Sequence, residues 1–179
     1  MSNKKVLVPL IEGFEETEYI AVRDILIRKG IDVDSVSLTD SKMIVANHNT
    51  IIGADSIYKN LKGYIDEYDA LFIPGGTIGV ENLDSNIKFD EILFHFSSEN
   101  KIIAAICAAP SLLAKRGLLK NKKSVVFPDK KLIEILIKNE ADYINDVNYI
   151  GDGNIFTGTK MQISIEYAEN LAKFIESKN

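Results

Sequence analysis

The sequence predicts an α/β protein in which helices cover both faces of a mostly parallel β-sheet, with a small β-hairpin beside it. Two observations support this fold class. The runs Lys5–Leu10, Ala70–Ile73 and Ile102–Ile106 are short and, after Lys5, continuously apolar, which is typical of strands buried on both faces. Segments with helical features separate these runs, and strands that alternate with helices build parallel sheets.

The first half of the chain follows this alternation. Glu15–Lys29 is predicted to be a helix, because acidic residues lie in its first turn, basic residues in its last, and Gly30 follows. Ile31–Leu38 alternates between apolar and polar residues and predicts the second strand. Met43–Val45 and Thr50–Ile52 flank a polar tip and predict the small hairpin.

The second half continues the pattern. Its predicted elements are a helix at Ile87–Ser97, a strand at Ser124–Phe127, a helix at Leu132–Lys138, a hairpin of Val147–Ile150 and Asn154–Thr157, and a helix at about Gln162–Ser177. Asn86 is the expected cap of the first of these helices. Parallel sheets of this kind bind ligands beyond the carboxyl ends of their strands, so we expect the functional residues in those loops.

Length and composition limit the class of protein. The 179 residues suit a single domain spanning 1–179. A net charge of −5, from 26 acidic and 21 basic residues, argues against a nucleic-acid surface. No apolar stretch approaches the roughly 18 residues of a membrane span, and no secretion signal is apparent. The single Cys excludes an internal disulfide, so we expect a cytoplasmic protein with a free thiol.

Cys107 directly follows the strand Ile102–Ile106, and a helix begins almost at once, with Pro110 in its first turn. Such a strand-to-helix turn presents its side chain at the carboxyl end of the sheet, next to backbone N–H groups and a helix terminus. That setting is expected to lower the pKa of the thiol and to stabilise an oxyanion. Cys107 is therefore a candidate nucleophile. The alternative is an inert core cysteine.

Glu18 is the second candidate. Ala21, Val22 and Ile25 follow it at helical spacing, which places Glu18 on the apolar stripe of its helix. A carboxyl group there needs a partner or takes up a proton, whereas the neighbouring Glu15 can face water. The alternative is an acid that only complements the helix dipole.

The third candidate is the loop Pro74-Gly75-Gly76-Thr77, which follows the strand Ala70–Ile73. Consecutive glycines leave backbone N–H groups unshielded, as phosphate and oxyanion sites require. Neither the G-x-G-x-x-G nor the G-x-x-x-x-G-K-[ST] spacing is present, so an oxyanion contact explains the loop better than a nucleotide does.

Three sequence pieces together carry a family resemblance. They are Glu-Gly-Phe-Glu-Glu-Thr-Glu after the first strand, Pro-Gly-Gly after a middle strand and Ala-Ala-Ile-Cys-Ala-Ala-Pro at the elbow. With these pieces the chain resembles the ThiJ/PfpI superfamily, in the branch of the Parkinsonism-associated protein DJ-one and its bacterial relatives. The resemblance implies a flavodoxin-like sandwich, a homodimer, and no metal or organic cofactor.

The resemblance also implies residue roles. Cys107 is the nucleophile, Glu18 hydrogen-bonds its sulfur, and the N–H groups of Gly76 and Ala108 line an oxyanion or sulfinate pocket. Arg28 matches a basic residue that the family places near the dimer interface and the site.

Two positions depart from the family pattern. Phe127 stands where many members have a His, so no Cys-His triad is evident and a cysteine peptidase is disfavoured. His48 stands at the hairpin tip where this branch tends to carry an Arg, and it replaces that cation only partly near pH 7. His95, among large apolar residues, is interpreted as structural.

Two functions remain open at this point. Cys107 could add to reactive dicarbonyls such as methylglyoxal, as glyoxalases and deglycases of this family do, with activity expected to be weak. Alternatively, Cys107 could oxidise to a sulfinate in a redox sensor or a chaperone-like protective protein.

Assembly is the last expectation. We expect a homodimer, because Tyr19, Leu26 and Ile27 lie off the predicted inner stripe of their helix and need cover. Beyond a small carbonyl substrate and this second copy, no nucleic-acid or membrane partner is expected.

Overall fold

A seven-stranded sheet forms the centre of the computed structural model, which describes residues 4–178. In spatial order its strands are β10 (Tyr149–Asp152), β11 (Ile155–Gly158), β7 (Ile102–Ile106), β6 (Ala70–Ile73), β1 (Lys5–Leu10), β2 (Asp32–Ser37) and β5 (Ser56–Ile57). All neighbouring pairs are parallel except β10 and β11. The order β2-β1-β6-β7-β11 is the flavodoxin-like order, and β1 and β6 flank its switch point.

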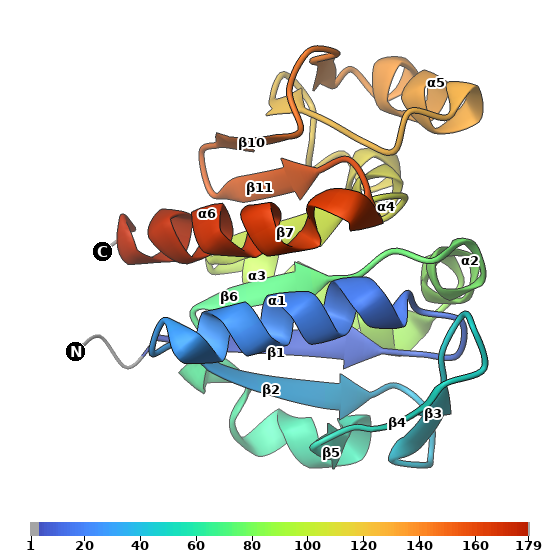
Figure 1. Ribbon diagram of the computed structural model, residues 1–179, viewed down its shortest axis with the longest axis vertical. Coiled ribbons are helices and arrows are strands. Elements are labelled where there is room, and N and C mark those ends of the chain that lie inside the picture. Colours follow the sequence, from blue (N-terminus) through green and yellow to red (C-terminus); the bar gives the residue numbers. More distant parts are fainter. Residues whose placement is uncertain (1–3, 179) are drawn as a thin grey trace.

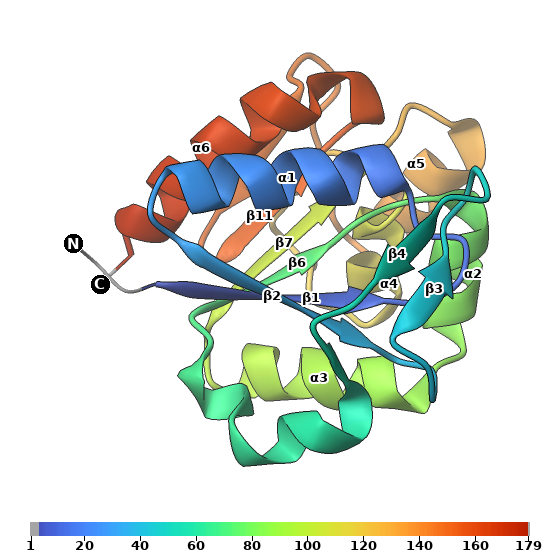
Figure 2. The same ribbon diagram turned by 60° about the horizontal axis from the view of Figure 1, so that its bottom comes forward.

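Helices cover both faces of the sheet, as predicted. They are α1 (Glu16–Arg28), α2 (Thr77–Asp84), α3 (Ile87–Ser98), α4 (Pro110–Lys115), α5 (Lys130–Lys138) and α6 (Ser164–Glu176). Helices α1 and α6 lie side by side on one face, and α3 lies on the other (Figures 1 and 2). Two buried apolar clusters, one on each face, hold the layers together. None of the helices within residues 4–178 is long and apolar enough to cross a membrane.

The orientation of α1 differs from the prediction by a small rotation. Its fully or almost fully buried residues are Glu18, Tyr19, Val22 and Leu26. Tyr19 and Leu26 are predicted on the outer face, but both belong to the apolar cluster that α1 forms with β1 and β2, and the Tyr19 ring packs edge-on against Phe14. Ile27 is 49% exposed, as expected.

The small predicted hairpin is present, formed by β3 (Met43–Val45) and β4 (Ile51–Gly53). It stands beside the carboxyl ends of the sheet strands, near α2 (Figure 1). Two short 3₁₀ turns, η1 (Tyr58–Gly63) and η2 (Ile65–Glu67), connect β5 to β6, and a third, η3 (Met161–Ile163), precedes α6.

The predicted strand at Ser124–Phe127 is wrong. Only β8 (Lys123–Ser124) is a strand, paired with the equally short β9 (Asp142–Tyr143). The Val125 N–H donates to the Thr157 hydroxyl and the Phe127 N–H to the Cys107 carbonyl. Because these backbone donors bind a side chain and a loop carbonyl, no regular ladder forms there.

Candidate active site

Cys107 occupies a sharp turn between β7 and α4. Its φ angle is 61°, in the left-handed region that residues other than glycine rarely adopt. The backbone is held from both sides, because the Cys107 N–H donates to the Gly158 carbonyl (3.0 Å) and its carbonyl accepts from the Phe127 N–H (2.8 Å). The thiol is half-buried at the carboxyl end of the sheet. This confirms the predicted strand-to-helix elbow.

The glycine loop after β6 fits closely against the loop after β1. Gly76 has a φ angle of +93°, and a Cβ there would lie 2.4 Å from the Gly13 carbonyl oxygen. The neighbouring Gly75 carbonyl accepts from the Glu15 N–H at 3.0 Å. A Cβ at Gly75 would lie 2.7 Å from the Cys107 Cβ and 2.9 Å from the Glu18 Oε2. Glycine at 75 therefore lets the thiol and the carboxyl group approach each other.

Glu18 is completely buried and faces Cys107. Its Oε2 accepts a 2.6 Å hydrogen bond from the Gly75 N–H, and its carboxyl group lies within hydrogen-bonding reach of the Cys107 thiol. The other oxygen, Oε1, has no partner among residues 4–178. Burial raises the pKa of Glu18 from 4.5 to about 7, although the Gly75 N–H and the thiol oppose the shift. Glu18 is thus poised to exchange a proton near neutral pH.

The predicted lowering of the Cys107 pKa is wrong in direction. Burial raises it, and the charge and hydrogen bond of Glu18 raise it further. The backbone N–H groups of Ala108 and Gly76 face the sulfur and act the other way, because they favour the charged thiolate. Above about pH 7 the pair holds a single proton, so a thiolate forms only when that proton moves to Glu18.

The raised pKa of Glu18 predicts a pH-dependent stability. Because the folded-state pKa (about 7) exceeds the unfolded value near 4.5, the stabilising contribution is complete below pH 4.5 and is lost as pH rises through 7. We expect Glu18→Gln, which cannot ionise, to unfold with a free energy up to about 3 kcal/mol above wild type at pH 8. At pH 5 the advantage should fall to about 1 kcal/mol or less. Urea denaturation at both pH values measures it, and equal stability at pH 8 would contradict the burial of a charged group.

Cys107 and Glu18 open into a pocket of about 570 Å³. Its lining includes Gly76 and Ala108 at the reactive end, so the structure brings four of the predicted site residues together. Glu15 also lines the pocket and is only 8% exposed, contrary to the expectation that it can face water. Its Oε2 accepts a hydrogen bond from the Asn47 amide at 3.3 Å, so the hairpin covers it.

Comparison with models of protein families gives a match that includes all the loops of this site. The model described as the DJ-1/PfpI family matches residues 4–174. The chain belongs to the DJ-1/PfpI family. It is 31% identical to the protein dj-1beta of Drosophila melanogaster over 174 residues, covering 95% of this chain and 90% of that protein.

A solved structure and a second relative extend this result. The crystal structure of Drosophila melanogaster DJ-1beta superposes with a TM-score of 0.90 at 29% identity, covering 99% of this chain and 92% of that one. A protein of Pyrococcus abyssi named a deglycase is 29% identical over 150 residues, covering 84% of this chain and 86% of that protein. The flavodoxin-like fold of the family is therefore shown for this member.

Neither histidine of this DJ-1/PfpI member supplies a triad. Phe127, at the position expected for the family His, lines the pocket and is 40% exposed. His95 lies on α3, with its ring edge-on to Phe96 and Nε2 3.3 Å from Asp66 Oδ1, in agreement with a structural role.

His48 lies at the hairpin tip and contacts the start of α1 rather than the thiol. Its N–H donates to the Glu16 carboxylate at 3.1 Å, and its ring Nδ1 lies 3.3 Å from Glu16 Oε2 and 3.7 Å from Glu15 Oε2. The ligand atoms of these three residues lie within 4.8 Å of one another, so the trio could hold a metal ion. In the structure, the contacts of His48 with Glu16 anchor the hairpin to α1, the helix that carries Glu18.

Arg28 is not brought to the pocket. It lies in the last turn of α1, ten residues after Glu18, which is about 15 Å along a helix axis. Its Nε donates to Asp24 Oδ2 at 2.7 Å, and the side chain is exposed. Within one chain Arg28 therefore has no contact with the candidate chemistry.

Proposed function

We propose that this protein is a cysteine-dependent enzyme that acts on reactive dicarbonyls, a glyoxalase or deglycase, without a cofactor. One observation carries the proposal: a single pocket places the Cys107 thiol beside a buried carboxyl group whose pKa is about 7. A general acid–base is most effective when its pKa lies near the working pH. The deglycase name of the Pyrococcus abyssi relative supports the same reaction class.

The first step of the proposed reaction forms a hemithioacetal. Glu18 takes the thiol proton, the Cys107 sulfur adds to the aldehyde carbon of methylglyoxal, and the carbonyl electron pair moves to oxygen. The N–H groups of Gly76 and Ala108 donate to this oxyanion, since among residues 4–178 neither donates to a backbone carbonyl.

Glu18 then completes the reaction as base and acid. It first gives the thiol proton to the oxyanion, which completes the hemithioacetal. It then removes the proton from the former aldehyde carbon and returns it to the neighbouring carbon, while the hydroxyl proton passes to the former ketone oxygen, so that one carbon is oxidised as the other is reduced. The resulting thioester is hydrolysed, and the sum is methylglyoxal plus water giving lactate. Without the family His at 127, one carboxyl group serves every proton transfer, so we propose slow turnover.

The test is steady-state consumption of methylglyoxal, with lactate measured as the product, by fully reduced protein. Many lactate molecules formed per Cys107 would support the enzyme. The substitution Phe127→His is expected to raise the rate of turnover if the histidine ring enters the pocket. Stoichiometric loss of methylglyoxal, ending when every thiol has reacted, would contradict catalysis.

A redox role is the second proposal, because the Gly76 and Ala108 N–H groups that face the sulfur could equally bind the oxygens of a sulfinate. Peroxide is the oxidant in this case. Mass spectrometry of peroxide-treated protein should show two added oxygen atoms on Cys107, and protein that gains none would exclude the sensor.

We also propose a homodimer. Exposed apolar side chains of two neighbouring helices gather on one side of the molecule: Ile20 of α1 is 47% exposed and Ile165 of α6 60%. Ile20 and Ile165 line the same shallow depression of the surface. Large exposed apolar patches mark interfaces, and a second copy of this chain is the partner that the family resemblance implies.

Light scattering should return twice the chain mass of 19.9 kDa at micromolar concentration. We expect Ile20→Glu to give the monomer mass, because it puts a charge into the patch. Ile87→Glu is the matched control, since Ile87 is 71% exposed on α3, on the opposite face of the sheet. A wild-type protein of monomer mass would refute the dimer.

A further inference from the structure

The pocket is much larger than methylglyoxal. Its volume is about 570 Å³, whereas a protein cavity of about 150 Å³ already holds benzene, a larger molecule than methylglyoxal. With the aldehyde carbon against Cys107, methylglyoxal would leave most of the pocket to water. A substrate with a larger group would fill it.

The chemistry of the wall indicates which group fits. Beside polar residues such as Glu81 and Gln162, five large apolar side chains line the pocket, here called the apolar wall: Val80, Phe127, Leu132, Ile135 and Met161. Leu132 and Ile135 are three residues apart on α5 and therefore share one face of that helix. Phe127 contributes an apolar ring at the position where the family resemblance leads us to expect a polar His.

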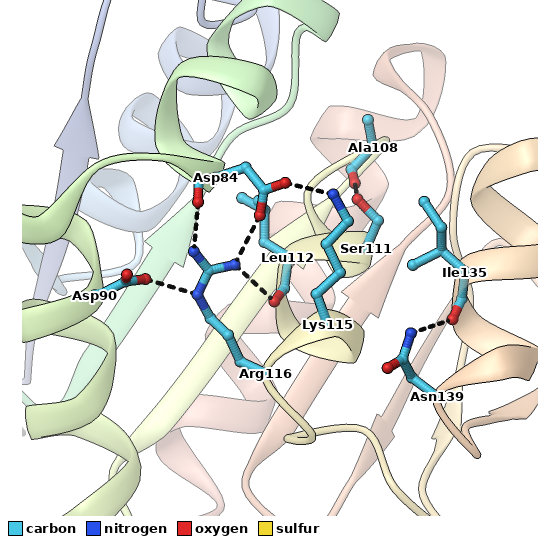
Figure 3. Close-up of polar contacts among 9 residues, drawn as sticks. All are labelled: Asp84, Asp90, Ala108, Ser111, Leu112, Lys115, Arg116, Ile135 and Asn139. Carbon is cyan, nitrogen blue, oxygen red and sulfur yellow. Dashed lines mark hydrogen bonds and ion pairs between the residues drawn. The ribbon is translucent and has the colours of Figure 1, made fainter.

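Two lysines, Lys115 and Lys131, line the pocket together with five acidic residues, and Lys115 is already paired. The Lys115 ammonium contacts the Asp84 carboxylate, which also accepts from the Arg116 guanidinium at 3.1 Å (Figure 3). Arg116 donates in turn to Asp90 at 2.7 Å. The charged groups of this cluster are paired with one another, so an anionic substrate that bound to them would have to break these contacts.

We propose that the preferred substrates are α-oxoaldehydes that carry an aryl or branched alkyl group, which the apolar wall binds. This inference rests on the proposed function and names its substrate class. The reaction balances as for methylglyoxal, with water as the sole co-reactant and an α-hydroxy acid as product. Burying a ring-sized apolar group is expected to raise kcat/KM by about 10- to 100-fold over methylglyoxal.

Initial rates with phenylglyoxal and methylglyoxal test the preference. The variant Leu132→Ser should lower the ratio of their kcat/KM values by about tenfold, since it removes part of the wall. The ratio corrects for the different intrinsic reactivity of the two aldehydes. Ile137→Ser is the control, because Ile137 is 59% exposed on the same helix and lies outside the pocket lining. Equal ratios in Leu132→Ser and wild type, or a preference for methylglyoxal, would overturn the proposal.

A binding measurement separates this inference from the proposed function. Acetophenone and acetone share a ketone but differ in the phenyl group, and neither has an aldehyde. If neither dicarbonyl is turned over, the enzyme proposal is refuted. The protection of Cys107 from alkylation by iodoacetamide then tests whether the apolar wall binds a phenyl group. Protection by acetophenone but not acetone, weakened by Leu132→Ser, supports the apolar site. Equal protection by both ketones, or none, overturns it.

Discussion

Replacing Cys107 with alanine is expected to reduce methylglyoxal consumption to the uncatalysed background. The proposed reaction begins with a bond between the Cys107 sulfur and the substrate, and the chain contains no second cysteine that could take over. Serine at 107 should be almost as inactive, because its hydroxyl holds its proton far more tightly than a thiol and no His assists. The measurement is kcat/KM for lactate formation in wild type and both variants.

The folded state of these variants is checked separately. Circular dichroism and the thermal midpoint should match wild type, since neither replacement is larger than cysteine. Consumption that survives in well-folded Cys107→Ala would mean that another group performs the chemistry, and the enzyme proposal built on this thiol would fail.

Replacing Glu18 with glutamine is expected to lower kcat/KM by about 10²- to 10⁴-fold, the usual contribution of a positioned general acid–base. In wild type, kcat/KM should rise with pH through an inflection near 7, where Glu18 loses its proton and becomes a base. Glutamine cannot titrate, so the inflection should disappear. A pH series of initial rates for the two proteins checks both expectations.

Glu16→Gln is the matched control. Glu16 is a glutamate on the same helix, but its carboxylate binds the hairpin through Thr50 and His48 instead of the thiol. We expect a change of less than about threefold in kcat/KM. Since Glu18→Gln is also expected to be the more stable protein at pH 8, a loss of activity there cannot be ascribed to unfolding. A Glu18→Gln protein that kept the inflection would assign the titration to another group.

Much of the fold was predictable, because it follows from local patterns. The strands Ala70–Ile73 and Ile102–Ile106 are apolar on both faces, and this pattern depends little on which element covers them. Glu18 could be placed in the interior from helical spacing alone. The elbow at Cys107 could be placed because Pro110 fixes where the next helix starts.

The features that were missed depend on long-range neighbours. Tyr19 is buried because its ring packs edge-on against Phe14 and reaches Ser35 of β2, a different element of the sheet. Val125 leaves the strand pattern because its N–H binds Thr157, 32 residues away. The pKa of Cys107 is raised because the thiol is buried and because Glu18 comes within reach of it beside the loop at Gly75. Spacing along the sequence indicates how a residue lies on its own helix or strand, whereas these contacts join residues of different elements.

The left-handed backbone at Cys107 limits the nucleophiles that this turn could acquire in evolution or by design. A β-branched side chain is a severe outlier at such a φ angle, so a threonine nucleophile would distort the turn. Asparagine and glycine accept the conformation but offer no nucleophile. Serine is unbranched and nearly the same size as cysteine. A descendant of this protein that changed from thiol to hydroxyl chemistry would therefore be expected to carry serine at 107.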